Sequence, residues 1–221
     1  MTAEVRVPNR RGEGARLRDE ILAAAEALLE ETPNEAAVTL RAVARRAGVS
    51  APSIYAHFAD RQAILLAVVQ GAFAELADRL RAAATGDQVD DERDDPGALV
   101  LATCDAYLDH AAARPQRYRL MFDGAWDGRE AVATSSSVTT DDLAGLGEEA
   151  LGILADRLRA CVDAGVSSST DPRSDAVALW LGLHGLAHQR AVAPAFPWPS
   201  DVVERVVRPL AGLAPSTLSR R

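Results

Sequence analysis

Several residue types are absent or scarce in this chain of 221 residues, and each absence excludes a class of protein. There is no lysine, so all 24 basic side chains are arginine. Cysteine occurs only as Cys104 and Cys161, which excludes a disulfide framework. Aromatic residues make up 5% of the chain, and no apolar run approaches the roughly 20 residues that span a bilayer. Because the N-terminus also lacks the apolar stretch of a secretory signal, we expect a soluble cytoplasmic protein.

The formal net charge of −8 argues at first against a polyanionic partner, but the charge is distributed unevenly. Nine arginines balance nine acidic residues in the first 61 positions, so the whole acidic excess lies in the rest of the chain. Residues 39–61 contain Arg41, Arg45, Arg46 and Arg61 against Asp60 alone. We therefore expect a small basic surface on an otherwise acidic protein.

Apolar residues recur at helical spacing along most of the chain, and no convincing strand is found. Residues that favour helix N-caps precede three of the segments, at Thr39, Ser50 and Asp60. The predicted helices span 15–31, 40–46, a short segment after Ser50, 60–83, 97–113, 116–122, 142–164, 172–192 and 201–213. Six acidic residues between positions 86 and 96 predict a solvated linker. The fold class is therefore all-α.

The most informative segment is 39–61, which reads TLRAVARRAGVSAPSIYAHFADR. Two short helices flank Gly48, a residue that readily adopts the left-handed conformation of a sharp turn. Ala44 is small enough to let the second helix approach closely, and Ile54 packs the corner. This spacing is that of a helix-turn-helix, an element that places its second helix in the major groove of DNA.

The same segment resembles the DNA-binding domain of the tetracycline-repressor (TetR) family. The resemblance covers about residues 15–65 and is carried by Thr39, Ala44, Gly48-Val49-Ser50, Ile54-Tyr55 and His57-Phe58. The chain departs from the family pattern at Arg61, where lysine is usual, and at Pro52, where glycine or another small residue is commoner. The arginine keeps the positive charge, whereas the proline can alter contacts in the groove.

The resemblance also implies which residues bind DNA. It suggests phosphate contacts from Thr39, Tyr55, His57 and Arg61, and base or backbone contacts from Ser50, Ala51, Pro52 and Ser53, with Arg41 and Arg45 nearby. Hydroxyl groups and arginines are common ligands of phosphate oxygens, which supports these roles on physical grounds. Thr39 and Ser50 also have a structural interpretation, since both residue types cap helices.

Residues 97–221 resemble, more weakly, the C-terminal domain of one branch of the family, through Trp180-x-x-x-His184-Gly185 and the segment RYRLMF at 117–122. Trp180, His184 and His188 follow one another at intervals of one helical turn, so they could line one wall of an effector pocket. The alternative is that Trp180 belongs to the core and His184 bonds to a neighbour. Further pocket candidates are Tyr107, Met121, Phe122, Trp126, Leu154, Leu158 and Cys161. The low aromatic content favours a hydrophobic ligand.

We expect no cofactor, no metal and no enzymatic activity. His184 and His188 have the spacing of a zinc-binding helix, but the glutamate of H-E-x-x-H and a third ligand are missing. No nucleophile elbow or phosphate-binding glycine loop occurs either. Two alternatives remain: a helical small-molecule-binding protein or enzyme with a vestigial helix-turn-helix, and a protein-interaction module with no role in DNA binding.

The sequence therefore predicts a flexible arm (1–14), a three-helix helix-turn-helix domain (15–62) and a helical-bundle domain for effector binding and dimerisation (63–221), with a long helix joining the two domains. A single recognition helix makes too few contacts for tight specific binding, so we expect a homodimer on a palindromic operator. The resemblance places the dimer surface on the last two helices, where Val202, Val206, Leu210 and Leu213 form an apolar stripe; packing within one chain is the alternative for each. The predicted function is that of a ligand-released transcriptional repressor associated with the nucleoid.

Overall fold

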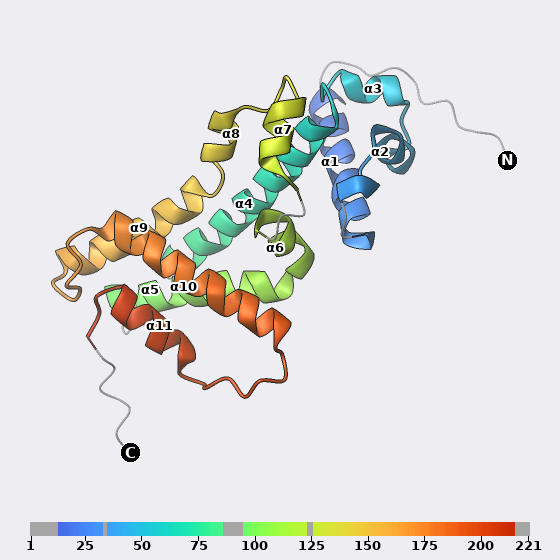
Figure 1. Cartoon of the computed structure of the whole chain (residues 1–221). Coiled ribbons are helices and arrows are strands. Elements are labelled where there is room, and N and C mark those ends of the chain that lie inside the picture. The colour runs from blue at the N-terminus through green and yellow to red at the C-terminus, as the bar shows by residue number, and fades with distance from the viewer. Residues whose placement is uncertain (1–12, 33–34, 86–94, 123–125, 215–221) are drawn as a thin grey trace. The chain divides into compact units, whose positions relative to one another are not determined.

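The computed structural model describes residues 13–32, 35–85, 95–122 and 126–214 (Figure 1). The predicted N-terminal arm, apart from its last two residues, and most of the predicted acidic linker lie outside these ranges. Within them the regular structure is helical, with one isolated β-bridge between Ser167 and Leu213. No helix in the described ranges is long and apolar enough to cross a membrane. The all-α prediction is confirmed.

The helices follow one another in the order in which the sequence places them. They are α1 (Glu13–Glu31), the 3-10 helix η1 (Glu35–Ala37), α2 (Leu40–Ala47), α3 (Ala51–Tyr55), α4 (Arg61–Thr85), α5 (Pro96–Ala113), α6 (Pro115–Phe122), α7 (Gly128–Thr134), α8 (Thr140–Ala144), α9 (Glu148–Asp163), α10 (Pro172–Val192) and α11 (Val202–Leu210).

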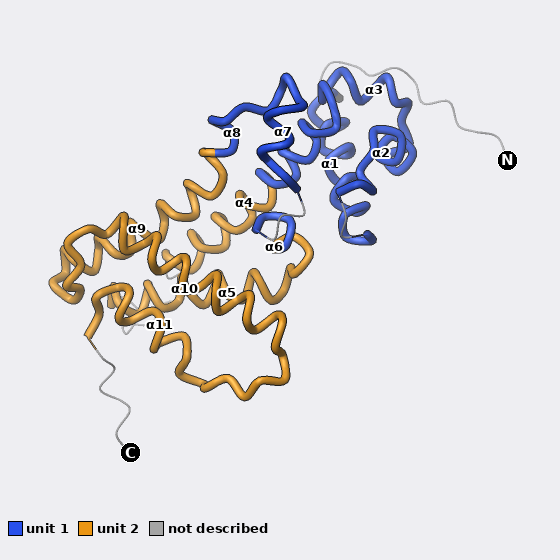
Figure 2. Tube along the Cα trace, in the orientation of Figure 1, with its two compact units in different colours: residues 1–70, 119–143 blue, residues 71–118, 144–221 orange. Residues whose placement is uncertain are grey.

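The chain divides into two compact units, each built from two separate stretches of sequence (Figure 2). The first unit contains residues 1–70 and 119–143, and the second contains residues 71–118 and 144–221. Helix α4 is continuous through both, with Gln70 the last residue in the first unit. The first unit therefore joins the helix-turn-helix to a segment that follows it by more than fifty residues.

The first unit is organised around α1, α2, α3 and the beginning of α4. Helix α2 contacts both α1 and α3, and the side chains of Ile21, Val43, Ile54 and Ile64 are fully buried. Thr39 caps α2 as predicted, because its Oγ1 accepts a hydrogen bond from the backbone N–H of Ala42 at 3.1 Å. These apolar contacts fix the angle between the short helices.

The second unit is a bundle in which α10 contacts α5, α9 and α11. Its core is mainly aliphatic, as the composition suggests. The largest fully buried side chains of these helices are Tyr107, His110, Leu154, Leu158, Leu179 and Leu183. Both cysteines are buried free thiols, as their apolar contexts predict.

Two features differ from the predicted helices. The predicted helix over 142–164 is wrong, because the chain leaves the helical path between Ala144 and Glu148. Gly147 has a φ angle of 78°, in the left-handed region that no residue of an α-helix occupies. Helix α7 was not predicted, since its seven residues carry too short an apolar pattern. Asp127 starts that helix by accepting hydrogen bonds from the N–H groups of Arg129 and Glu130.

Replacing the two glycines of this region should have opposite effects on stability. A Cβ at Gly147 would lie 3.0 Å from Cε1 of Phe73 and on a left-handed backbone, so we expect Gly147→Ala to lower the free energy of unfolding by about 1–3 kcal/mol. A Cβ at Gly152, inside α9, meets nothing within 4 Å, so Gly152→Ala should raise it by about 0.5–1 kcal/mol. Urea denaturation measures both changes. Equal stability of the two variants would contradict this interpretation.

Candidate functional site

The helix-turn-helix consists of α2, the turn at Gly48 and α3. Gly48 has a φ angle of 68°, and the N–H of Val49 bonds to the carbonyl of Ala44 at 3.0 Å, so the turn closes directly on the end of α2. A Cβ at Gly48 would meet no heavy atom within 4 Å, so the backbone angle alone explains the glycine. Ala44 is buried, as predicted for a close approach between the helices. The packing therefore holds α3 in one orientation against α2.

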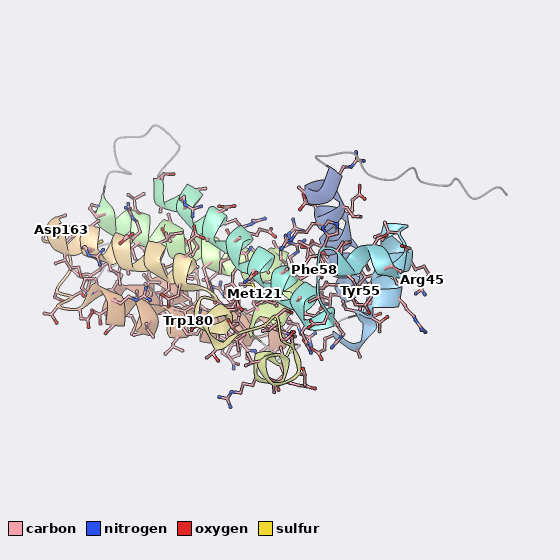
Figure 3. The ribbon with its side chains drawn as sticks, turned by 90° about the horizontal axis from the view of Figure 1, so that it is seen from above. Arg45, Tyr55, Phe58, Met121, Asp163 and Trp180 are labelled. Atoms are coloured by element: carbon pink, nitrogen blue, oxygen red, sulfur yellow. The ribbon has the colours of Figure 1, made fainter. Side chains whose placement is uncertain are left out.

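The side chains predicted to meet DNA lie on the surface of this unit to different extents. Tyr55, the last residue of α3, is 59% exposed, whereas Phe58 three residues later is buried; both are marked in Figure 3. Pro52 is exposed, and Ala51 and Ser53 are half-buried. Helix α3 thus presents small side chains, with one large aromatic ring at its end.

The two serines of α3 behave differently from the prediction that Ser50 caps the helix. The Ser50 side chain makes no capping hydrogen bond, although the residue occupies the N-cap position. Its Oγ lies 2.7 Å from Oγ of Ser53 instead. Each hydroxyl oxygen retains a further lone pair, so the pair can still accept or donate a hydrogen bond outside the protein.

Only some of the arginines in the first unit are available to a phosphate. Arg16 pairs with Glu20 at 3.0 Å, Arg46 pairs with Glu31 at 2.7 Å, and the guanidinium of Arg18 lies 5.1 Å from the centre of the Phe58 ring. Arg41 and Arg45 of α2 are exposed and have no ion-pair partner among the residues that the structure describes. The structure therefore singles out these two as the basic groups that face solvent without a counter-charge.

Arg61 has a different setting from the one implied by the resemblance. Its Nε donates to the carbonyl of Val38 at 2.8 Å and its Nη2 to the carbonyl of Glu35 at 2.5 Å. Nη2 also lies 3.4 Å from the Glu35 carboxylate. These bonds connect the first residue of α4 to the segment immediately before α2, a structural role that sequence reasoning missed because it depends on a fold-dependent contact.

Two further candidates border the helix-turn-helix. Thr39 is exposed, and its Oγ1 accepts the capping bond from Ala42 while the hydroxyl proton remains able to reach a phosphate. His57 is half-buried, and its ring lies beside the beginning of α1, where a Cβ on Gly14 would be 3.9 Å from Cε1. Both residues belong to the same unit as Arg41, Arg45 and Tyr55.

In the second unit, part of the predicted pocket forms a chain of hydrogen bonds. The hydroxyl groups of Tyr107 and Tyr118 are 2.9 Å apart, and the Tyr118 hydroxyl lies 2.7 Å from Nδ1 of His184. The ring of Trp180 lies 6.0 Å from that of His184. Tyr118 was not among the predicted residues, although it lies in the segment RYRLMF that carried the resemblance.

Burial keeps this chain neutral. Desolvation raises the pKa of Tyr107 to about 12, and hydrogen bonds with Tyr118 and Trp180 offset only part of that effect. The hydroxyl therefore keeps its proton at physiological pH. A buried cluster of neutral donors and acceptors suits an uncharged polar group better than a charged one.

The remaining pocket candidates are distributed over both units. Leu154, Leu158 and Cys161 are buried in the helical bundle of the second unit, where burial raises the pKa of the Cys161 thiol to about 11. His188 is exposed. Met121, Phe122 and Trp126 belong to the first unit, and Trp126 donates from Nε1 to Oε1 of Gln62 at 2.8 Å. Trp180 and His184 are thus grouped with Tyr107 but assigned to a different unit from these three.

Within the described ranges, no group of three or more His, Cys, Asp or Glu side chains is placed to hold a metal ion. His184 and His188, the pair with zinc-like spacing, differ in setting. The first bonds to Tyr118, and the second is exposed.

Two family models match the chain. Residues 21–68 match the model of bacterial regulatory proteins of the tetR family, and residues 100–212 match that of the tetracycline repressor-like C-terminal domain. No curated protein matches.

Solved structures with the same fold cover nearly the whole chain. A protein of unknown function from Rhodococcus sp. RHA1 is 25% identical, with a TM-score of 0.72 over 95% of this chain and 100% of that one. The fatty acid degradation regulator FadR of Bacillus halodurans is 15% identical, with a TM-score of 0.66 and coverages of 97% and 100%. SmeT, the repressor of the multidrug efflux pump SmeDEF of Stenotrophomonas maltophilia, is 24% identical, with a TM-score of 0.57 and coverages of 88% and 86%.

Removing an unpaired arginine from α2 should weaken binding to any DNA duplex. We expect Arg41→Ala and Arg45→Ala each to lower affinity and to reduce the slope of log affinity against log salt by about 1, because each loses one phosphate contact. Arg46→Ala is the matched control, since that guanidinium is paired with Glu31. Fluorescence anisotropy with a labelled duplex between about 50 and 200 mM salt measures both quantities. An unchanged salt slope in both variants would show that α2 does not face the phosphates.

Proposed function

Because the chain belongs to the TetR family and is a DNA-binding transcriptional regulator, we propose that it is a ligand-released repressor that binds a palindromic operator as a homodimer. Regulators of this family bind DNA and small-molecule effectors, act as dimers and are typically not enzymes. In this proposal residues 15–62 bind DNA, and residues 63–221 bind the effector and dimerise. We expect the protein in the cytoplasm, associated with the nucleoid.

The observation that carries the proposal is the pair of unpaired arginines, Arg41 and Arg45, next to an exposed Tyr55 on the helix-turn-helix. Guanidinium and hydroxyl groups are the side chains that bind phosphate oxygens most often. The small residues Ala51, Pro52 and Ser53 let α3 approach the bases closely and contact thymine methyl groups. Thr39 and His57 add phosphate contacts, and Arg61 holds α2 in place.

We propose that the dimer surface is centred on the outer face of α10. Val177, Leu181 and Val192 on this helix and Phe196 just after it are 36%, 55%, 60% and 53% exposed. Gly185 lies on the same face, and a Cβ there would meet nothing within 4 Å in its own chain. A glycine inside a helix is unfavourable by about 1 kcal/mol relative to alanine. Close approach of a second α10 at this point gives Gly185 a role that its own chain does not.

The apolar stripe of α11 has a different role in this proposal. A Cβ on Gly182 of α10 would lie 2.9 Å from Cδ1 of Leu210 and 3.0 Å from Cγ1 of Val206. These two side chains therefore pack α11 onto α10 of the same chain. Leu213 is buried as well, and Val202 is half-buried. Of the two meanings of this stripe, packing within the chain explains Val206, Leu210 and Leu213, and α11 flanks the dimer surface.

For the effector, we propose an apolar molecule with one uncharged polar group that bonds to the chain formed by Tyr107, Tyr118 and His184. Trp180 provides the flat apolar wall, and Leu154, Leu158 and Cys161 provide its aliphatic surroundings. Met121, Phe122 and Trp126 stay as candidates on the first unit. An effector releases DNA only if it binds the DNA-competent and incompetent dimers with different affinity.

Selection of bound duplexes from a random library by the purified protein tests the operator and the dimer together. We expect a palindrome whose half-sites are separated by about one helical turn or a multiple of it. Leu181→Arg should give a monomer in sedimentation and enrich no palindrome, because it places a charge in the dimer surface. Val166→Arg is the matched control, since Val166 is 41% exposed and lies outside α10. A dimeric Leu181→Arg variant, or a single asymmetric site, would refute this arrangement.

Release of the selected duplex tests the effector site. In a library of small apolar molecules, we expect some to lower the anisotropy of the labelled duplex with the wild-type protein. His184→Ala should weaken their effect about tenfold without changing affinity for the duplex, because the bond to Tyr118 is lost. His188→Ala, one turn further along α10, should behave like wild type. Equal sensitivity of both variants would exclude His184 from the site, and failure of every compound would favour a constitutive DNA-binding protein.

A further inference from the structure

Two segments that lie far apart in the sequence are hydrogen-bonded within the first unit. Ser135 donates from Oγ to Oδ2 of Asp60 at 2.7 Å, and Ser137 donates from Oγ to the same oxygen at 3.3 Å. The N–H of Ser137 also bonds to Oγ of Ser135 at 3.1 Å, which orders the two hydroxyls. A second link joins the indole N–H of Trp126 to Gln62. Residues 126–138, called here the serine segment, are thus attached to the beginning of α4 at two points.

The serine segment is packed into the first unit and does not merely touch its surface. Trp126, Ala131, Ser135 and Val138 are all buried, with exposed fractions of 8%, 0%, 9% and 3%. The first apolar residues of α4, Ile64 and Leu65, are fully buried in the same unit. Buried hydroxyl groups need partners, and Ser135 finds its partner in the Asp60 carboxylate.

Asp60 serves two functions with its two oxygens. Oδ1 accepts the N–H of Ala63 at 2.9 Å and caps α4, whereas Oδ2 accepts the serine hydroxyls. Desolvation alone would raise the pKa of Asp60, but the bonds from Ser135, Ala63 and Ser137 outweigh it and lower the pKa. The carboxylate is therefore ionised at physiological pH, and hydrogen bonds to an ionised acceptor are stronger than those to a neutral one.

The location of this carboxylate gives the contact its significance. Asp60 follows the end of α3 at Tyr55 by five residues, and its neighbour Arg61 bonds to the carbonyls of Glu35 and Val38 before α2. The first residues of α4 are thus connected to both ends of the helix-turn-helix. The serine segment, however, lies inside the stretch 100–212 that matches the C-terminal domain model. A part of the C-terminal region is therefore built into the unit that carries α2 and α3.

We propose that Ser135 and Ser137, through Asp60, and Trp126, through Gln62, are positioning residues for operator binding. The serine segment holds the N-terminus of α4 and thereby fixes the orientation of the recognition helix α3. This proposal rests on the proposed operator binding of the dimer. It gives the C-terminal region a connection to the DNA-binding unit in addition to the continuous helix α4.

A positioning role predicts a specific pattern of effects on DNA binding. Affinity for an unrelated duplex depends mainly on charge, which comes from Arg41 and Arg45 and does not change when the serines are replaced. Affinity for the operator also requires both recognition helices to fit successive major grooves. Loss of the serine hydroxyls should therefore weaken operator binding and leave non-specific binding unchanged.

The test compares Ser135→Ala/Ser137→Ala with wild type in the full chain, using the duplex obtained by selection and an unrelated duplex of equal length. The double variant leaves the cap of α4 on Asp60 in place. We expect about tenfold weaker binding to the selected duplex, unchanged binding to the unrelated one, and faster amide hydrogen exchange over residues 56–63 without DNA. Ser136→Ala is the matched control, because Ser136 is exposed in the same segment and has no side-chain hydrogen bond among the described residues.

A second variant and the exchange measurement separate the outcomes. Gln62→Ala removes the acceptor of Trp126 and should weaken operator binding in the same direction. The proposal is wrong if the double variant and Gln62→Ala both bind the operator as tightly as wild type. It is also wrong if affinity for both duplexes falls together with the free energy of unfolding, since the contacts are then only structural. If the wild-type protein prefers no duplex, operator binding itself fails, and unchanged exchange over residues 56–63 would independently show that the serines do not hold α4.

Discussion

Asp60 and Arg61 carry opposite charges at consecutive positions, and each holds a different part of the first unit. The carboxylate caps α4 and accepts the hydroxyl groups of Ser135 and Ser137, whereas the guanidinium bonds to the carbonyls that precede α2. All of these bonds involve an ionised group, and removing one partner would leave the other with an unsatisfied charge in a partly buried place. The orientation of α2 and α3 depends on this pair, because both helices are too short to keep a fixed orientation by themselves.

The distribution of charge explains how an acidic protein can bind a polyanion. Acidic side chains neutralise most arginines of the first unit, as Glu31 does for Arg46, and these pairs contribute nothing to a basic surface. Arg41 and Arg45 are left without such partners on one short helix. A local field of this kind acts within about one Debye length, roughly 8–10 Å, so a distant acidic excess has little effect on it. Net charge is therefore a poor guide to the partner of this chain.

The second unit solves a different problem, the burial of polar groups in an aliphatic bundle. The hydroxyls of Tyr107 and Tyr118 and the imidazole of His184 satisfy one another in a continuous chain. Such a network is stable when complete and sensitive when one member changes partner. A ligand that bonds to any member therefore acts on helices α5, α6 and α10 together. This cooperativity makes the cluster a suitable place for an effector to change the protein.

The sequence by itself determined the all-α class, the helix-turn-helix with its Thr39 cap and Gly48 turn, and the family, because these signals lie within a few residues of one another. It missed α7, joined α8 to α9, and could not distinguish Arg41 and Arg45 from Arg61. It also left open whether Val206 and Leu210 pack against their own chain. Only the tertiary structure decided these points, because ion pairs, the bond of Ser135 to Asp60 and the contact of α11 with Gly182 join residues that the fold alone brings together.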